Sequence, residues 1–442
     1  MNRLRKIGLI VFLNILSIPI FAQETITVNL EQAVDIALNE NPTIKIAEME
    51  IQRQDYVKKE TIGNLLPSIN GTGNYTYNIM SPVMFLPEGA FGPGSGGAMR
   101  MGFDNSFNAG ANLGLPLYMP TIYRTMKMNK QQMLIAVESA RSSKIELANQ
   151  VKKTYLAILL GENSAEVIKD NIDLAKQVVE TSRNSYELGI MSEYDLITAE
   201  VQLSNLTPTL ILAENSVSNA RLLLNMLLSL PMDTKIIMEE KLEDFVKDIN
   251  NNSQLSNSSD ENSQLKQLDL KIGLLEHQLK IQKSLRLPTL NAFLQYQVLT
   301  QSNDWKISSY DWKGTAFTGL QLNIPIFAGN SKVNKEHQIR NTIGQVSMQR
   351  DYLKENVNYQ IEMSMSNMIK SRGQMKSNFV AKTQAKKGYI ISKTRYDIGA
   401  GTIIELNSSQ VSLLRAKLNY AQSIFDYKSA MADYEKIIGK IK

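Results

Sequence analysis

Two short stretches of this chain are near copies of each other: YELGIMSEYDL at residues 186–196 and YDIGAGTIIEL at residues 396–406. In both, a tyrosine stands three positions before a glycine and an acidic residue follows, and Gly399 lies 210 residues after Gly189. Other pairs recur in the same order, such as Leu66-Pro67 with Leu287-Pro288 and Pro116 with Pro325. The chain is therefore predicted to be a tandem duplication whose halves stack into one quasi-symmetric body.

The first 22 residues predict a secretory signal peptide. Three bases (Arg3, Arg5 and Lys6) precede a mostly apolar run, and the segment ends on the small residue Ala22. A membrane anchor is the alternative, but the run is shorter than the roughly 20 residues that a spanning helix needs.

The composition limits the possible partners of the protein. The whole chain has a net charge of +5, and removing the three bases of the signal leaves +2. Such a small excess argues against a nucleic-acid partner. The chain has no cysteine, so an exported protein of this kind forgoes disulfides and an anchor on an N-terminal cysteine.

Long segments free of helix breakers predict two helical hairpins. One long helix, from Pro120 to about Tyr186, spans about 100 Å at 1.5 Å per residue, and the second copy has an equal one. Each is expected to end at a glycine in the left-handed conformation, Gly189 or Gly399. A second helix then returns, and the hairpins must pack on one another because neither buries enough surface alone. A further helix is predicted over residues 30–62.

Four other segments alternate with a period of two. In Ile69 to Ile79 the odd positions are apolar, aromatic or glycine, and the even positions are all Asn or Thr. Strands of about ten residues with an almost uncharged polar face suit a membrane β-barrel in an exported chain. A half-buried sheet of a water-soluble protein alternates as well, and remains the alternative. The loop over residues 81–102 is expected to be flexible, and the loop over 300–313 holds Trp305 and Trp312, either as anchors at the lipid–water boundary or as incidental aromatics.

Four strands cannot close a barrel, and open sheet edges are not tolerated in lipid. Oligomerisation is therefore required: two chains would supply eight strands, and three would supply twelve, enough for a water-filled channel. The fold class predicted is mainly α with membrane β. The expected organisation is a signal peptide 1–22; a first repeat 23–232 with strands at about 68–79 and 103–117 and a hairpin 120–230; an equatorial segment with an Asn/Ser-rich insertion 233–264; and a second repeat 265–442 with strands at about 289–299 and 314–327 and a hairpin 331–438.

These features together resemble the TolC-like outer-membrane efflux proteins, the outer membrane factor family. The resemblance covers residues 30–438 and rests on the duplicated Leu-Pro junctions, on the strand ends LPLY and IPIF, and on the two glycine tips. It implies a homotrimer with a twelve-stranded barrel in the outer membrane of a Gram-negative-type bacterium and a helical tunnel in the periplasm. It also implies a passive exit duct that works with a periplasmic adaptor and an inner-membrane pump of the RND or ABC type.

The resemblance further implies a gate at the hairpin tips. A latch would join Tyr396 to Asp195, and a second would join an arginine to Tyr194, but this chain has Gly401 at the position of the arginine. Two acidic positions of the family's constriction fall on Glu405 and Ser408, so only the first is acidic here. A ring of Glu405 carboxylates would favour cations. The alternative for Asp195 and Glu405 is an ordinary helix-start charge that complements the helix dipole.

Other chemistry is sparse. The two histidines, His277 and His337, stand far apart, and no nucleophile–base pair, phosphate loop or metal-ligand cluster occurs in the sequence. The protein is therefore expected to be neither an enzyme nor a cofactor or metal binder. The rival to an exit duct is a structural coiled-coil protein of the outer membrane or cell surface without a transport role. Matched strand pairs in both repeats favour the duct.

Overall fold

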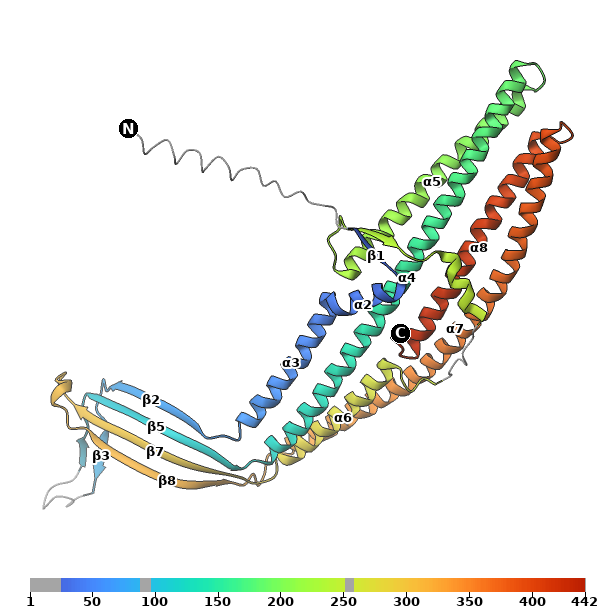
Figure 1. Ribbon diagram of the computed structural model, residues 1–442. Helices are drawn as coiled ribbons and strands as arrows, with labels where there is room; N and C mark the ends of the chain where they lie inside the picture. Colours follow the sequence, from blue (N-terminus) through green and yellow to red (C-terminus); the bar gives the residue numbers. More distant parts are fainter. Residues whose placement is uncertain (1–24, 88–96, 251–257, 442) are drawn as a thin grey trace, which may run out of the picture. The chain divides into compact units, whose positions relative to one another are not determined.

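The computed structural model describes residues 25–87, 97–250 and 258–441 of the chain. The predicted signal peptide, residues 1–22, and much of the Asn/Ser-rich insertion, residues 251–257, lie outside the described residues. The described part is mainly helical, with one four-stranded sheet and two small strand pairs (Figure 1). None of its helices is long and apolar enough to cross a membrane.

The two helical hairpins have the predicted form. The first consists of α4, Pro120–Glu187, and α5, Glu193–Leu228. The second consists of α7, Ser331–Asp397, and α8, Ile403–Ile437. A shorter helix precedes the strands in each half, α3 over Pro42–Gly63 and α6 over Ser263–Ser284.

The prediction of a single helix over residues 30–62 is wrong at one point. It is divided into α2, Leu30–Glu40, and α3 by Asn41, whose ψ of 128° is extended. Pro42 disfavours a helical conformation at the residue before it and suits the first position of a new helix. The Asn41 side chain fills the break, since Nδ2 donates to the Leu227 carbonyl at 2.8 Å and Oδ1 accepts from the Thr43 amide at 2.8 Å.

The four-stranded sheet is antiparallel throughout, in the order β2-β5-β7-β8. Its strands are β2, Ser68–Tyr77; β5, Asn105–Tyr118; β7, Thr289–Ser302; and β8, Lys313–Asn323, which ends before the predicted residue 327. The register places Ile69 opposite Leu113 and Leu113 opposite Leu294, whereas Asn70, Asn112 and Gln295 form the neighbouring row. The alternation therefore gives the sheet one mainly apolar and one mainly polar face. Exceptions are Thr300 and Thr318 on the apolar face and the neighbouring rings of Phe293 and Phe317 on the polar face.

Two strand pairs were not expected. β1, Thr25–Val28, pairs in parallel with β6, Lys235–Met238, and thereby ties the start of the described chain to the segment between the repeats. β3, Val83–Leu86, pairs with β4, Gly97–Arg100, inside the loop that was expected to be flexible. Short 3₁₀ helices lie at Leu242–Asn250 and Ile307–Ser309.

The chain forms two compact units, and each draws on both halves of the sequence. Unit 1 contains the described residues of 25–49, 138–266 and 351–441, with the hairpin tips; unit 2 contains the described residues of 50–137 and 267–350, with the sheet. The long helices α4 and α7 run through both. The boundaries of the two tandem repeats themselves stay a prediction from the sequence.

The core of unit 1 gathers side chains from both hairpins around the β1–β6 pair. Ile158, Leu224, Leu228 and Ile424 are almost completely buried there. Tyr155 is buried among them and donates its hydroxyl to the Val28 carbonyl at 3.1 Å; the same burial raises the pKa of this hydroxyl. A phenol that is neutral and hydrogen-bonded can be buried at little cost.

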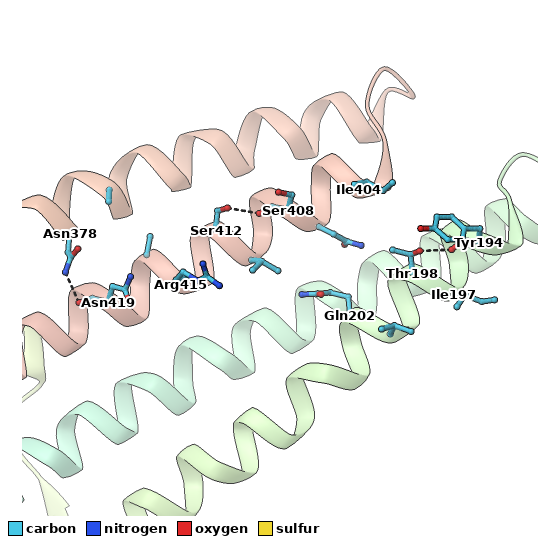
Figure 2. A pocket seen from close by; sticks show the side chains of 15 residues that line it. Tyr194, Ile197, Thr198, Gln202, Asn378, Ile404, Ser408, Ser412, Arg415 and Asn419 are labelled. Atoms are coloured by element: carbon cyan, nitrogen blue, oxygen red, sulfur yellow. Dashed lines mark hydrogen bonds between the residues drawn. The ribbon is translucent and has the colours of Figure 1, made fainter.

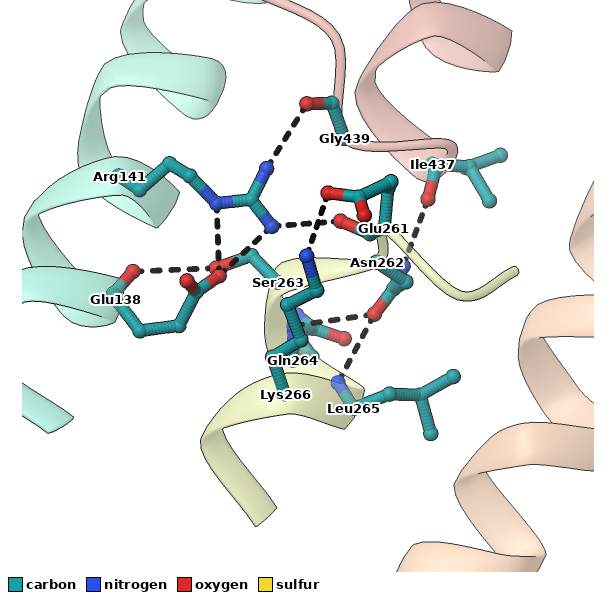
Figure 3. Close-up of polar contacts among 10 residues, drawn as sticks. All are labelled: Glu138, Arg141, Glu261, Asn262, Ser263, Gln264, Leu265, Lys266, Ile437 and Gly439. Carbon is teal, nitrogen blue, oxygen red and sulfur yellow. Dashed lines mark hydrogen bonds and ion pairs between the residues drawn. The ribbon is translucent and has the colours of Figure 1, made fainter. Parts of the chain in front are cut away.

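Arg141 of α4 fastens the end of the chain to this unit (Figure 3). Its guanidinium donates to the Gly439 carbonyl at 3.1 Å and to the Glu261 carbonyl at 2.6 Å, and it pairs with Glu138 at 2.8 Å. Asn262 completes the junction by donating to the Ile437 carbonyl at 2.8 Å. The planar fork of arginine suits such a site, because it serves several acceptors at once.

Gly161, the one interruption that the sequence shows in the first long helix, is a point of close helix contact. A Cβ at this position would lie 2.6 Å from Cγ2 of Val217 in α5. The glycine thus lets α4 and α5 approach at the base of the first hairpin, although glycine inside a helix costs about 1 kcal/mol relative to alanine.

We expect Gly161→Ala to destabilise the protein in spite of its better helix propensity, because the β-branched side chain of Val217 cannot move away easily. The apparent melting temperature in detergent should fall, and the double variant Gly161→Ala/Val217→Ala should recover it in large part. A single variant as stable as the parent would show that this contact is not tight.

Candidate functional site

The two hairpin tips share one turn geometry. Gly189 has a φ of +73° and Gly399 a φ of +71°, the left-handed conformation in which glycine carries no Cβ penalty. After Gly189 the Ile190 amide donates to the Ser185 carbonyl at 2.8 Å, and the corresponding distance in the second tip is also 2.8 Å. In both turns, the amide after the glycine thus donates to a carbonyl in the last turn of the long helix, as in a Schellman motif.

The returning helices start with matching caps, and these caps place the two acidic residues. Ser192 accepts a hydrogen bond from the Asp195 amide, and Thr402 accepts one from the Glu405 amide, each at 3.2 Å. Asp195 also accepts from the Ser192 hydroxyl at 2.7 Å. Both carboxylates thus lie in the first turn of a helix, where negative charge is favourable. Within one chain this is the geometry of the helix-start alternative, and it leaves both carboxylates accessible to a neighbour.

Glu405 has a counter-ion that sequence reasoning missed. The guanidinium of Arg395, in the last turn of α7, lies 3.7 Å from the Glu405 carboxylate and donates to the Ala400 carbonyl at 3.1 Å. The signal available in the sequence was a base just before the tip glycine, a position where the helix dipole favours positive charge. The second tip therefore carries a pair of opposite charges rather than an isolated carboxylate.

Gly401 is held against this arginine. A Cβ on Gly401 would lie 3.1 Å from Cβ of Arg395 and 3.2 Å from the Tyr396 amide nitrogen. A side chain at this position would require these neighbours to move by a few tenths of an ångström. The arginine that the family resemblance places at residue 401 thus has little room here, and Arg395 supplies a positive charge to the same turn.

Tyr396 contacts a residue other than Asp195 within the chain. Its hydroxyl lies 3.3 Å from Oγ of Ser182, a fully buried side chain of α4. No hydrogen bond joins Tyr396 to Asp195 in the part of this single chain that the structure describes. A latch between these two residues of neighbouring chains stays a prediction, and Ser182 is a partner that no motif pointed to.

Tyr194 and Ser408 line one groove, seen in Figure 2. The groove has a volume of about 870 Å³ and lies between α5 and α8, with Asn378 and Ala381 of α7 at one side. Its polar groups are mostly amides and hydroxyls, several of them bound to the backbone: Asn378 donates to the Asn419 carbonyl at 3.1 Å. Arg415 is its one charged side chain. Among the residues with described side chains, no group of His, Cys, Asp and Glu could hold a metal ion.

A buried amide pair joins the two hairpins near the tips. Gln410 of α8 donates from Nε2 to Oδ1 of Asn171 in α4 at 2.6 Å, and both side chains are at most 5% exposed. The neighbouring residues of α8 that face the same way, Leu406 and Leu413, are apolar and buried. A polar pair in an apolar seam fixes the register of two helices, since any slip would leave the amides unpaired.

Comparison with known proteins agrees with this arrangement. Residues 33–229 match the family described as outer membrane efflux protein. The chain is also 20% identical over 336 residues to the outer membrane protein TolC of Vibrio cholerae, an alignment that covers 76% of this chain and 77% of that protein. The chain is therefore similar to the outer membrane efflux proteins over nearly half of its length. It accordingly resides in the outer membrane and extends into the periplasm.

Solved structures share its fold. The crystal structure of CusC, in work on its folding and transmembrane channel formation, has a TM-score of 0.74 at 14% identity and covers 93% of this chain and 92% of that one. The CmeC outer membrane channel of Campylobacter jejuni has a TM-score of 0.73 at 17% identity, with 93% and 85% covered. A mainly helical chain with a membrane sheet is thus the common architecture, and an efflux channel is the role that the family supports.

Proposed function

We propose that three copies of this efflux protein close a twelve-stranded barrel and act together as a passive exit duct. The observation that carries this proposal is the open sheet: β2 and β8 are its outer strands, and each has a row of unpaired backbone groups on one side. In a membrane such edges must pair. Strand β8 of one copy would therefore pair with β2 of the next.

The composition of the polar face supports three copies rather than two. An eight-stranded barrel is filled by its own side chains, whereas twelve strands leave a lumen. On the polar face Asn70, Asn112 and Gln295 form one row, and Asn291 lies opposite Gln321 in another, with no charge among them. Uncharged amides prefer contact with water to burial without partners, so this face suits a wet lumen.

The hairpin tips are proposed to be the periplasmic gate of the duct. Three copies would bring three Arg395–Glu405 pairs and three Tyr396 hydroxyls around one axis. The groove lined by Tyr194 and Ser408 is open on the same part of the hairpins, and we assign to it the periplasmic adaptor that links the duct to an inner-membrane pump. The tips are thus the part through which the pump would act on the channel.

Stoichiometry and conductance test the architecture. The mature protein in detergent should have the mass of a trimer by light scattering corrected for bound detergent, and should form channels in planar bilayers. A cysteine introduced on β8 should form a disulfide with one on β2 between chains, but the same pairing should not arise within a chain. A stable monomer or dimer in a conducting preparation would reject the twelve-stranded barrel.

Ion selectivity tests the charges at the second tip. We expect weak selectivity in the parent, because Arg395 neutralises Glu405. Glu405→Gln should shift the reversal potential in a KCl gradient toward anions and Arg395→Gln toward cations, while the double variant should resemble the parent. The exposed pair Lys169–Glu214, 2.8 Å apart between α4 and α5, is the matched control, and its neutralisation should leave selectivity unchanged. Identical reversal potentials in all variants would place these charges outside the conduction path.

A double-mutant cycle distinguishes the two partners of Tyr396. If the latch to Asp195 of a neighbouring chain exists, Tyr396→Phe and Asp195→Ala should each raise the open probability, and their effects should not add. Each hydrogen bond is worth about 1 kcal/mol, repeated three times in the ring. If only the contact with Ser182 matters, Tyr396→Phe should instead couple with Ser182→Ala and be additive with Asp195→Ala, a result that would refute the latch.

A further inference from the structure

The loop between β7 and β8 forms an aromatic cluster with the sheet. It contains Trp305 and Trp312, the two tryptophans of the protein. The rings of Trp305, Tyr310 and Trp312 lie 6.1, 5.7 and 6.5 Å from the ring of Phe107 in β5, and Tyr75 in β2 lies 4.9 Å from it. Aromatic rings at such separations stabilise one another beyond their buried area.

This cluster lies on the apolar face of the sheet. Phe107 projects on the same side as Ala109, Ala111 and Leu113, the residues whose cross-strand partners include Leu294 and Tyr296. The loop does not continue straight on from the strands; its aromatic side chains pack over Tyr75 and Phe107 on the side that faces lipid in a membrane barrel.

Hydrogen bonds hold the loop in this position. Asn303 Oδ1 accepts from the Asp104 amide at 2.9 Å, and Tyr310 donates its hydroxyl to the Asp304 carbonyl. Asn105, which is 2% exposed beneath the loop, accepts from the Tyr75 hydroxyl at 2.8 Å. The folded-back loop is thus a built part of the sheet rather than a mobile connection.

The aromatic rings remain accessible although they pack together. Trp305 is 63% exposed and Trp312 is 42% exposed, and charged residues adjoin them: Asp304, Lys306, Asp311 and Lys313. An indole ring has an apolar body and one N–H donor, so it is most stable where hydrocarbon meets headgroups. The alternating signs of the adjoining charges suit the zwitterionic or hydrated layer just above it.

The other end of the sheet carries a matching aromatic residue. A β-bulge between Pro116 and Tyr118 shifts the register of β5, so that Tyr118 stands opposite Leu290 on the apolar face. From Phe107 to Tyr118 are 11 positions, or about 37 Å along a strand, and a tilt of about 40° reduces this to roughly 28 Å across a bilayer. That span agrees with an apolar band about 25 Å tall between two aromatic girdles.

We infer that the loop over residues 303–312 is a membrane anchor that seats its tryptophans in the headgroup–acyl boundary of the outer leaflet and so fixes the depth of the sheet in the bilayer. The partner is the lipid itself. The anchor loop is continuous with the apolar face of the sheet, and in the outer membrane that face contacts lipid. The anchor is independent of how the tips gate the duct.

Fluorescence tests this inference directly, because the two tryptophans are the only ones in the protein and both belong to the cluster. The full mature protein would be reconstituted in vesicles of phosphatidylcholine brominated at defined acyl positions. Bromines near the headgroup should quench the emission more than bromines near the chain ends, and iodide added to the water should quench weakly. Strong quenching by iodide together with no quenching by any brominated lipid would overturn the anchor.

Three variants assign the fluorescence quenching to Trp305 or Trp312 and test how the loop is held. Trp305→Phe and Trp312→Phe keep an aromatic ring and leave one reporter each, and both remaining tryptophans should show the shallow quenching pattern. Phe107→Ala removes the ring on which the loop packs, and should raise iodide quenching and lower bromolipid quenching while the oligomer and its circular dichroism persist. Unchanged quenching in a folded Phe107→Ala oligomer would show that packing on the sheet does not position the loop.

Discussion

Backbone groups at the edges of the four-stranded sheet are the constraint on which the rest of this structure depends. Each unpaired N–H or C=O costs several kcal/mol in hydrocarbon. One chain supplies β2, β5, β7 and β8, and it leaves one edge of β2 and one edge of β8 open. The proposed assembly satisfies these edges by pairing β8 of one copy with β2 of the next.

The helical hairpins meet this requirement by close and specific contact rather than by a large apolar core. Gly161 lets α4 and α5 touch, Asn171 and Gln410 set the register of α4 against α8, and Arg141 fastens the chain end. Each of these contacts can form only when the long helices lie in one particular register. Helices about 50 to 100 Å long that were shifted by one turn at the base would also be out of register at the tip, so these contacts fix the register.

The tips show how two copies of a motif can diverge while their backbone stays the same. Gly189 and Gly399 end their helices in the same left-handed turn, and Ser192 and Thr402 start the next helices with the same cap. The charges differ, since Asp195 bonds to its own cap whereas Glu405 faces Arg395. In the proposed threefold assembly, the two unlike hairpins would give two distinct sets of tip contacts from a single duplicated scaffold.

The sequence by itself determined the local structure: the glycine turns, the returning helices, the alternation of the four strands and the resemblance to the efflux family. These features depend on residues within a few positions of one another, where conformational preference and period decide. It predicted Asp195, Glu405 and Tyr396 as candidate residues, but it missed Arg395 beside Glu405, Ser182 beside Tyr396 and the break at Asn41. Only the tertiary structure decided that Tyr396 meets Ser182, that the strand register joins four alternations into one apolar face, and that the tryptophan loop folds onto that face. Such contacts join residues far apart in the chain, and their formation depends on how whole elements pack, which no local pattern encodes.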